Sequence, residues 1–217
     1  MSEAYARGRT ASTAGARGLL RFAVMIYLDH AATTRLHPLA REAMLPFLDG
    51  RFGNPSGLYE AGRDAQSAVD GARRTVAECL GARPSEILFT SGGTESINTA
   101  MLGIAYAMRR AGAGNHVITT AIEHHAGLHT AQALEELGFE ITYVGCGPDG
   151  HVALAELESA LRPETVLVSV MLANNEVGAV QPVEGVAETL RKYSRQKRHR
   201  VLLHTDAVQA PGWRPLD

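Results

Sequence analysis

A turn of small residues between an apolar segment and a helix is the stretch of this sequence best suited to chemistry. Ser91, Gly92 and Gly93 follow the apolar residues 87–89 and lead into a helix with regularly spaced apolar residues. A ligand can approach such small residues closely, and the first N–H groups of a helix have no intrahelical partner. The turn therefore predicts a phosphate site, with the Thr94 hydroxyl as an extra donor. An ordinary turn capped by Ser or Thr is the alternative.

Three further groups of polar residues each come shortly after an apolar segment. They are Glu123-His124-His125 after residues 116–119, Asn174-Asn175-Glu176 after 166–171, and residues 204–209 after 201–203. Parallel strands would bring these groups to the carboxyl edge of one sheet, where open α/β sheets bind ligands. An imidazole that stacks on a ring, a carboxylate that keeps a ring nitrogen protonated and a phosphate site suit a phosphorylated heteroaromatic cofactor. Pyridoxal 5′-phosphate (PLP) uses such a protonated ring as an electron sink.

Alternating strand and helix patterns predict the sheet that would position these groups. Strands are expected at 87–89, 116–119, 141–144, 166–171 and 201–203, and residues 26–28 form a strand or an extended lead-in. Helices are expected from Pro38, at 59–80, through 97–108, and at 126–137, 153–161 and 183–190. The segment 166–171 is apolar on both faces, as in a strand covered on each side. The predicted fold class is α/β, with a mostly parallel sheet and helices on both faces.

Composition sets limits on the class of protein. The chain has 217 residues, 45% hydrophobic and 20% charged, and a formal net charge of −2. This balance is typical of a globular protein and gives no argument for a nucleic-acid or membrane partner. No apolar run reaches the roughly 18 residues that a membrane span needs. Cys79 and Cys146 have no metal-binding or disulfide spacing, which suits a reducing cytoplasm.

Residues 1–24 are expected to form a separate segment. They are rich in arginine and small residues and contain one acid, Glu3. The segment could be a transit-like leader that directs import into an organelle, a disordered tail, or an extension before a start at Met25. The apolar face of the helix that begins at Pro38 comprises Ala40, Ala43, Met44, Phe47 and Leu48.

Several segments between residues 25 and 217 resemble, in order and spacing, the cysteine desulfurase and selenocysteine lyase branch of the class V aminotransferase-like PLP enzymes. They are Tyr27-Leu28-Asp29-His30-Ala31-Ala32-Thr33-Thr34, Gly53-Asn54-Pro55-Ser56, residues 89–96, Glu123-His124, Ala173-Asn174-Asn175-Glu176-Val177-Gly178 and His204-Thr205-Asp206-Ala207-Val208-Gln209. The resemblance implies the N-terminal part of an aspartate aminotransferase-like, PLP-binding large domain over residues 25–217. The C-terminal part of that domain and the small domain would be absent.

The resemblance also implies how the cofactor would be held. Gly93 and Thr94 would bind its phosphate. His124 would stack on the pyridine ring and assist proton transfer, as the catalytic residue of this part of the chain. Asp206 would pair with the pyridinium nitrogen.

On the substrate side, the resemblance places Gln209 against the ring hydroxyl of the cofactor. Asn175 would lie near that hydroxyl and the substrate carboxylate, and Ala32 belongs to a loop that would cover the substrate. The activity implied is conversion of L-cysteine to L-alanine, with the sulfur transferred to a protein persulfide for iron–sulfur cluster assembly. The family also implies a homodimer and a sulfur-acceptor protein as partners.

Two residues that the family needs have no match. The lysine that binds PLP covalently follows the aspartate motif in the family, whereas Lys192 and Lys197, the only lysines, precede Asp206. Neither Cys79 nor Cys146 matches the catalytic cysteine. We therefore expect this polypeptide to be inactive alone. Selenocysteine lyase activity, and a non-catalytic fragment that binds PLP or a partner, are the alternatives.

Two other interpretations of the polar residues are weaker. His125 and His129 are four residues apart and could share a metal, but no third ligand is evident and no metal site is predicted. The strand before Asp206 resembles one that delivers a magnesium-binding acid in a nucleoside triphosphatase. The turn at Ser91 lacks the Gly-Lys-Ser/Thr of a P-loop.

Overall fold

The computed structural model describes residues 26–196, 199–214 and 216, so the predicted leader at 1–24 lies outside the described residues. The chain divides into two units, one ending at His30 and the other beginning at Ala31. In the first unit, residues 26–30 form neither helix nor strand. The Tyr27 and His30 rings meet edge to face, with centroids 5.2 Å apart.

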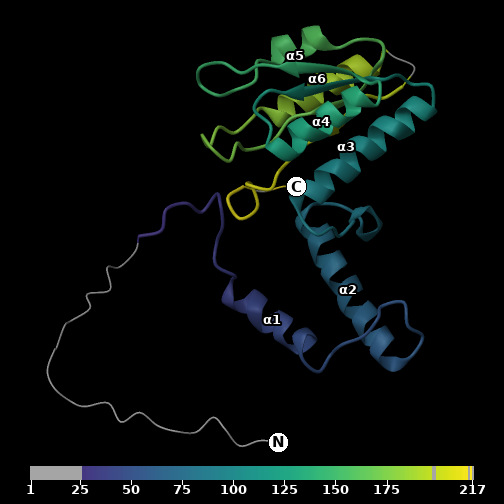
Figure 1. The fold of residues 1–217 in the computed structure, drawn as a ribbon, viewed down its shortest axis with the longest axis vertical. Helices are drawn as coiled ribbons and strands as arrows, with labels where there is room; N and C mark the ends of the chain where they lie inside the picture. The colour runs from purple at the N-terminus through teal and green to yellow at the C-terminus, as the bar shows by residue number, and fades with distance from the viewer. Residues whose placement is uncertain (1–25, 197–198, 215, 217) are drawn as a thin grey trace, which may run out of the picture. The chain divides into compact units, whose positions relative to one another are not determined.

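The second unit is built on a parallel sheet. Its strands are β1 (His116–Thr120), β2 (Glu140–Val144), β3 (Thr165–Ser169) and β4 (Leu202–His204), in the order β2-β1-β3-β4. Figure 1 shows the sheet with the labelled helices around it. All the pairings are parallel. The predicted fold class is therefore confirmed, and each of these strands lies where the apolar segments predicted one.

Helices cover both faces of the sheet because its central strands are apolar on both sides. Val117 and Leu167 pack into one buried cluster with α3 (Gly93–Arg110) and α4 (His125–Glu136). Ile118 and Val168 point into a second cluster with α5 (Leu154–Ala160) and α6 (Val183–Ser194). This two-sided burial holds the carboxyl ends of β1, β3 and β4 in fixed relation to one another.

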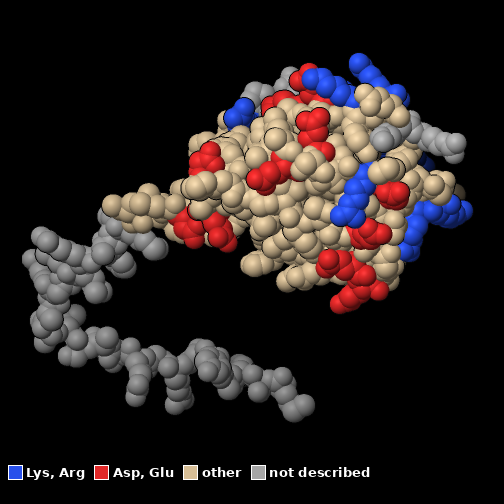
Figure 2. All heavy atoms as spheres, turned by 90° about the horizontal axis from the view of Figure 1, so that it is seen from above, with Lys and Arg blue, Asp and Glu red and all other residues tan. Residues whose placement is uncertain are grey.

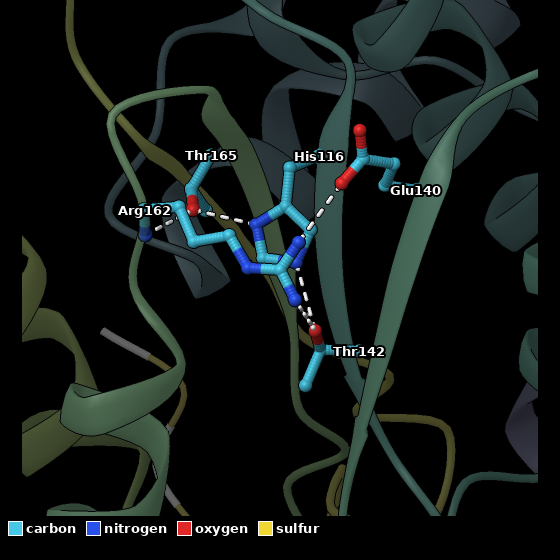
Figure 3. A network of polar contacts seen from close by, with 5 residues as sticks. All are labelled: His116, Glu140, Thr142, Arg162 and Thr165. Carbon is cyan, nitrogen blue, oxygen red and sulfur yellow. Dashed lines mark hydrogen bonds and ion pairs between the residues drawn. The ribbon is translucent and has the colours of Figure 1, made fainter.

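A polar network ties the amino ends of β1, β2 and β3 together (Figure 3). The fully buried His116 ring lies 2.7 Å from the Thr165 hydroxyl through Nδ1 and 2.9 Å from the Thr142 hydroxyl through Nε2. The Arg162 guanidinium donates to Glu140 at 2.9 Å and to Thr142 at 3.4 Å. Burial, and secondarily the positive charge of Arg162, lowers the pKa of His116.

One expectation about local structure is wrong. Residues 87–89 form no strand, although Ile87 has extended dihedral angles (φ −93°, ψ 124°). The Ile87 carbonyl accepts from the Arg73 guanidinium, and Leu88 and Phe89 are 70% and 46% exposed. An extended segment becomes a strand only when another strand completes its hydrogen bonds.

The apolar face expected on the first helix is not buried. The helix is α1 (Pro38–Leu48), and none of its residues is buried in the described structure. Phe47 is 39% exposed and Leu48 is 73% exposed. After it, α2 (Glu60–Cys79) and the short 3₁₀ helix η1 (Pro84–Glu86) lead to the turn at residue 91. The period of apolar residues thus predicted the helix correctly but not what its apolar face contacts.

Candidate functional site

The predicted site residues come together around one cavity of about 390 Å³. Its lining consists of Ala31, Ala32, Gly93, Thr94, Ile97, His124, Met171, Ala173, Asn175, Asp206, Val208 and Gln209. Every residue assigned a cofactor or substrate role from the sequence is in this set. They come from the segments after β1, β3 and β4, from the first turn of α3, and from the loop at residues 31–32. Because residues 87–89 are not a strand, the predicted phosphate-binding residues Gly93 and Thr94 stand at a helix start rather than at a fourth strand end.

The first turn of α3 faces the cavity without a side-chain cap. Gly92 is the N-cap, and its carbonyl accepts the Ser96 N–H at 3.1 Å. Glycine has no side chain that could accept an N–H of the first turn. The N-cap therefore differs from the Ser or Thr cap that was the alternative expectation. The Ser91 amide and hydroxyl instead donate to the Glu95 carboxylate, each at 2.6 Å. The amides left for an anion are therefore those from Gly93 onward, and Ser91 is not among them.

Gly93 allows a close approach between α3 and the loop after β4. A β-carbon at this position would lie 2.9 Å from the Cγ2 atom of Val208. The cavity wall at this point thus depends on a residue without a side chain. Thr94 follows in the same helical turn and also lines the cavity.

His124 is the N-cap of α4, and this role orients its ring. Its Nδ1 atom accepts the Ala126 N–H at 3.1 Å. A nitrogen that accepts a hydrogen bond carries no proton, so the neutral imidazole holds its proton on Nε2. The His124 ring is exposed, as a group that stacks on a ligand must be.

Asp206 brings a buried carboxylate to the end of β4. The residue is 9% exposed, and its Oδ1 atom accepts the Val208 N–H at 2.9 Å. Two residues earlier, His204 Nδ1 lies 2.8 Å from the Ser169 hydroxyl. Burial lowers the pKa of His204, and the Asp206 charge partly opposes this effect. The Asp206 side chain thus lines the cavity in an orientation set by the Val208 N–H.

Asn174 and Gln209 are carboxamide residues at the site that contact the backbone. Asn174 Oδ1 accepts the N–H groups of Glu176 and Val177, at 2.9 and 3.0 Å, so this residue stabilises the turn. Asn175 is the one that lines the cavity. Gln209 donates from Nε2 to the Ala31 carbonyl at 2.9 Å and so fixes the loop that contains Ala32.

Sequence reasoning missed the apolar wall and one buried acid. Ile97, Met171, Ala173 and Val208 line the cavity, but apolar residues near strand ends are too common to mark a site. Glu123 is 6% exposed, and burial raises the pKa of its carboxyl. Hydrogen bonds partly offset that shift, whereas the nearby Asp206 charge adds to it.

The other lysine, cysteine and histidine residues considered from the sequence do not line the cavity where the structure describes them. Lys192 forms an ion pair with Glu188 on α6 at 3.1 Å and does not line the cavity, and Lys197 lies outside the described residues. Cys79 and Cys146 are exposed free thiols. The His125 and His129 rings stack with centroids 5.8 Å apart. The described residues contain no group of three or more side chains that could hold a metal ion.

Two larger hollows lie along α6, with volumes of about 580 and 560 Å³. The first is lined by residues of α6 and β4, and the second also by Leu80, Leu172 and the segment after β4. Neither includes a predicted site residue. The smaller cavity is the better candidate because only there do an imidazole, a carboxylate, two amide side chains and an open helix start converge.

Comparison with known proteins points to the same family as the motifs. A model of the aminotransferase class-V family matches residues 26–217. A putative cysteine desulfurase of Bacillus subtilis (strain 168) is 49% identical over 192 residues, which are 88% of this chain and 48% of that protein. A cysteine desulfurase of Methanosarcina thermophila is 47% identical over 192 residues, 88% of this chain and 46% of its own.

A solved NifS-like protein has a TM-score of 0.83 at 41% identity, over 88% of this chain and 51% of its own. The chain thus spans about half the length of the curated relatives that it matches. The family match covers the whole of the sheet, its helices and the cavity. The chain therefore belongs to the aminotransferase class-V family.

Proposed function

We propose that the 390 Å³ cavity is the pyridoxal 5′-phosphate site of a cysteine desulfurase, of which this chain forms the N-terminal half. The observation that carries the proposal is the convergence of residues far apart in the sequence, from Ala32 to Gln209, on one cavity. The relatives named cysteine desulfurases, at 47% and 49% identity, support the substrate class.

The residues present fit the cofactor. The uncapped start of α3 offers backbone N–H groups at the positive end of a helix, which suits a phosphate. The buried Asp206 carboxylate suits a protonated ring nitrogen, and the exposed His124 ring suits stacking on a flat ligand. Ile97 and Met171 supply apolar wall for the ring.

When bound, pyridoxal 5′-phosphate supplies an electron sink for negative charge that develops on the substrate. The residues of this chain maintain the conditions for it. Asp206 holds a proton on the ring nitrogen, and Gly93 and Thr94 hold the phosphate through their amides. His124 covers one face of the ring and presents its Nε2 proton, because Nδ1 is occupied by the Ala126 N–H. Asn175 orients the substrate carboxylate.

In the whole protein, L-cysteine is converted to L-alanine and its sulfur passes to a cysteine of the protein as a persulfide. A sulfur-acceptor protein then takes the sulfur, and the working unit is a homodimer. We expect the 217-residue chain by itself to hold the cofactor without a covalent bond, because both of its lysines precede Asp206 and Lys192 does not line the cavity. The isolated chain is inactive for the same reason.

A chimera tests the activity. Residues 26–217 replace the matching half of the Bacillus subtilis relative, and the purified chimera is assayed for sulfide and alanine with L-cysteine, and for selenide with L-selenocysteine. We expect it to retain the cofactor and release sulfide. The same chimera with Asp206→Ala should lose activity by about a hundredfold or more, because the ring nitrogen loses its fixed negative partner.

A chimera that is folded by circular dichroism but retains no cofactor would contradict the cofactor assignment. One that retains the cofactor and acts only on L-selenocysteine would contradict the substrate and support the sibling activity.

A further inference from the structure

Glu123 is a buried acid that joins the end of β1 to the segment after β3. Its Oε1 atom accepts the Thr120 hydroxyl at 2.7 Å and the Met171 N–H at 2.8 Å. Thr120 is the last residue of β1, and Met171 lies two residues beyond β3. The three residues are each at most 6% exposed, so these hydrogen bonds are shielded from water. We call this pair of contacts the Glu123 bridge.

The bridge connects two walls of the cavity. The next residue after Glu123 is His124, which caps α4 and lines the cavity. On the other side, Met171 lines the cavity and begins the segment that leads to Asn175. A second contact runs parallel to the bridge, because Asn174 donates from Nδ2 to the Ile122 carbonyl at 2.9 Å. The segment before His124 is therefore attached twice to the segment before Asn175.

Burying a carboxylate costs desolvation free energy, and Glu123 accepts only one amide N–H and one hydroxyl in return. Burial raises the pKa of Glu123, and the neighbouring Asp206 carboxylate raises it further. A neutral side chain could fill the same volume without that cost. Glutamate at this position has the reach to contact Thr120 and Met171 at once, which a smaller or apolar side chain lacks.

We propose that Glu123 is a positioning residue, which sets the gap between the His124 ring and the Met171–Asn175 wall by bridging Thr120 and Met171. The inference rests on the proposed cofactor site and goes beyond it, since Glu123 itself does not line the cavity. Without the bridge the two walls separate, and the imidazole no longer lies parallel to a bound ring. The role depends on an acceptor oxygen at the right reach, not on the negative charge.

The test uses the 217-residue chain and pyridoxine 5′-phosphate, which has the ring and phosphate of the cofactor but no aldehyde. Titration by NMR gives the affinity and the limiting ¹H shift of the ligand's 2-methyl group, which responds to an imidazole ring stacked above it. Partial unfolding reduces the amount of ligand bound but not this limiting shift. A merely structural role for Glu123 would therefore leave the limiting shift unchanged.

We expect Glu123→Ala to weaken binding by about tenfold and to move the limiting shift toward that of the free ligand. Glu123→Gln keeps an acceptor oxygen and should retain the wild-type shift and an affinity within about threefold. The shorter side chain of Glu123→Asp cannot reach both Thr120 and Met171, so this variant should behave like Glu123→Ala. It provides the test of the proposal if the alanine variant does not fold. An unchanged limiting shift in the alanine and aspartate variants would overturn the proposal.

Thr165→Val is the matched control for loss of a buried hydrogen bond in the same sheet. The Thr165 hydroxyl contacts His116 and the Arg162 N–H at the opposite end of β3 (Figure 3). This variant should be less stable yet keep the wild-type limiting shift. If wild-type chain does not bind the ligand, both the cofactor site and the positioning role are refuted. Binding with an unchanged shift in the Glu123 variants refutes the positioning role alone.

Discussion

At the scale of single residues, His116 shows how burial fixes a protonation state. Its ring is enclosed by the Thr142 and Thr165 hydroxyls, and the Arg162 guanidinium lies against the same network. Burial and the Arg162 charge both disfavour a second proton and lower the pKa of His116. The folded chain therefore keeps this imidazole neutral at a pH at which the unfolded chain protonates it.

This difference makes stability depend on pH. Below the ordinary histidine pKa of about 6.5, the unfolded chain binds a proton that the folded His116 does not bind, so the free energy of unfolding falls as pH falls. His204, whose pKa burial also lowers, acts in the same direction. His116→Gln removes the His116 part. Between pH 7.5 and 5.5 the variant should lose about 1 kcal/mol less than wild type in urea unfolding. Equal losses in the two proteins would contradict a neutral buried His116.

The residues of the cavity were predictable to different degrees. Gly93, His124, Asn175 and Asp206 stand in motifs a few residues after strands or at a helix start, and the structure places them all on one cavity. Their roles remain predictions. Glu123 stands in the same motif as His124, but no role was predicted for it, because an acid after a strand is usually exposed and only the packed structure reveals that it is buried.

At the scale of elements, α3 contains two glycines with opposite surroundings. Gly93 begins the helix at the cavity, where an added β-carbon would lie 2.9 Å from the Cγ2 atom of Val208. Gly103 lies in the helix interior and is exposed, and an added β-carbon would meet nothing within 4 Å. Helix propensity favours alanine over glycine at both positions. The two glycines therefore differ only in their surroundings, because Gly93 lines the cavity and Gly103 does not.

We expect Gly103→Ala to raise the free energy of unfolding by roughly 0.5–1 kcal/mol and to leave binding of pyridoxine 5′-phosphate unchanged. Gly93→Ala should leave stability nearly unchanged, because Val208 is 61% exposed and can move, but it should weaken binding. Urea unfolding and ligand titration of the two variants measure both effects. Equal affinities for the two variants would show that the start of α3 does not hold the phosphate.

The positions of helices and strands were predictable from local sequence patterns. The pairing or packing of a segment with another segment was not. Each helix and each strand of the sheet lies within a few residues of its predicted position. Residues 87–89 have the composition of a strand but lack a ladder partner among the described residues, and the apolar face of α1 is exposed. Neither outcome can be predicted from periodicity. The spacing of apolar residues indicates the local conformation, but not which other segment pairs with it or packs on it.

At the scale of the whole molecule, charged side chains of both signs share one face of the surface. Figure 2 shows acidic and basic side chains next to one another on the face in view, in keeping with a formal net charge of −2. Across the described part of the chain, no helix combines the length and apolar character needed to cross a bilayer. The family match extends over residues 26–217, and the chain spans about half of its curated relatives.

We propose above all that the cavity at the carboxyl ends of β1, β3 and β4 holds a phosphorylated pyridine ring. The most direct measurement is the set of intermolecular nuclear Overhauser effects between the isotope-labelled 217-residue chain and saturating pyridoxine 5′-phosphate. We predict contacts from the ligand ring to the His124 imidazole and from its 5′-methylene group to the Gly93 and Thr94 amides. Contacts confined to the hollows along α6, or no saturable binding, would contradict the claim.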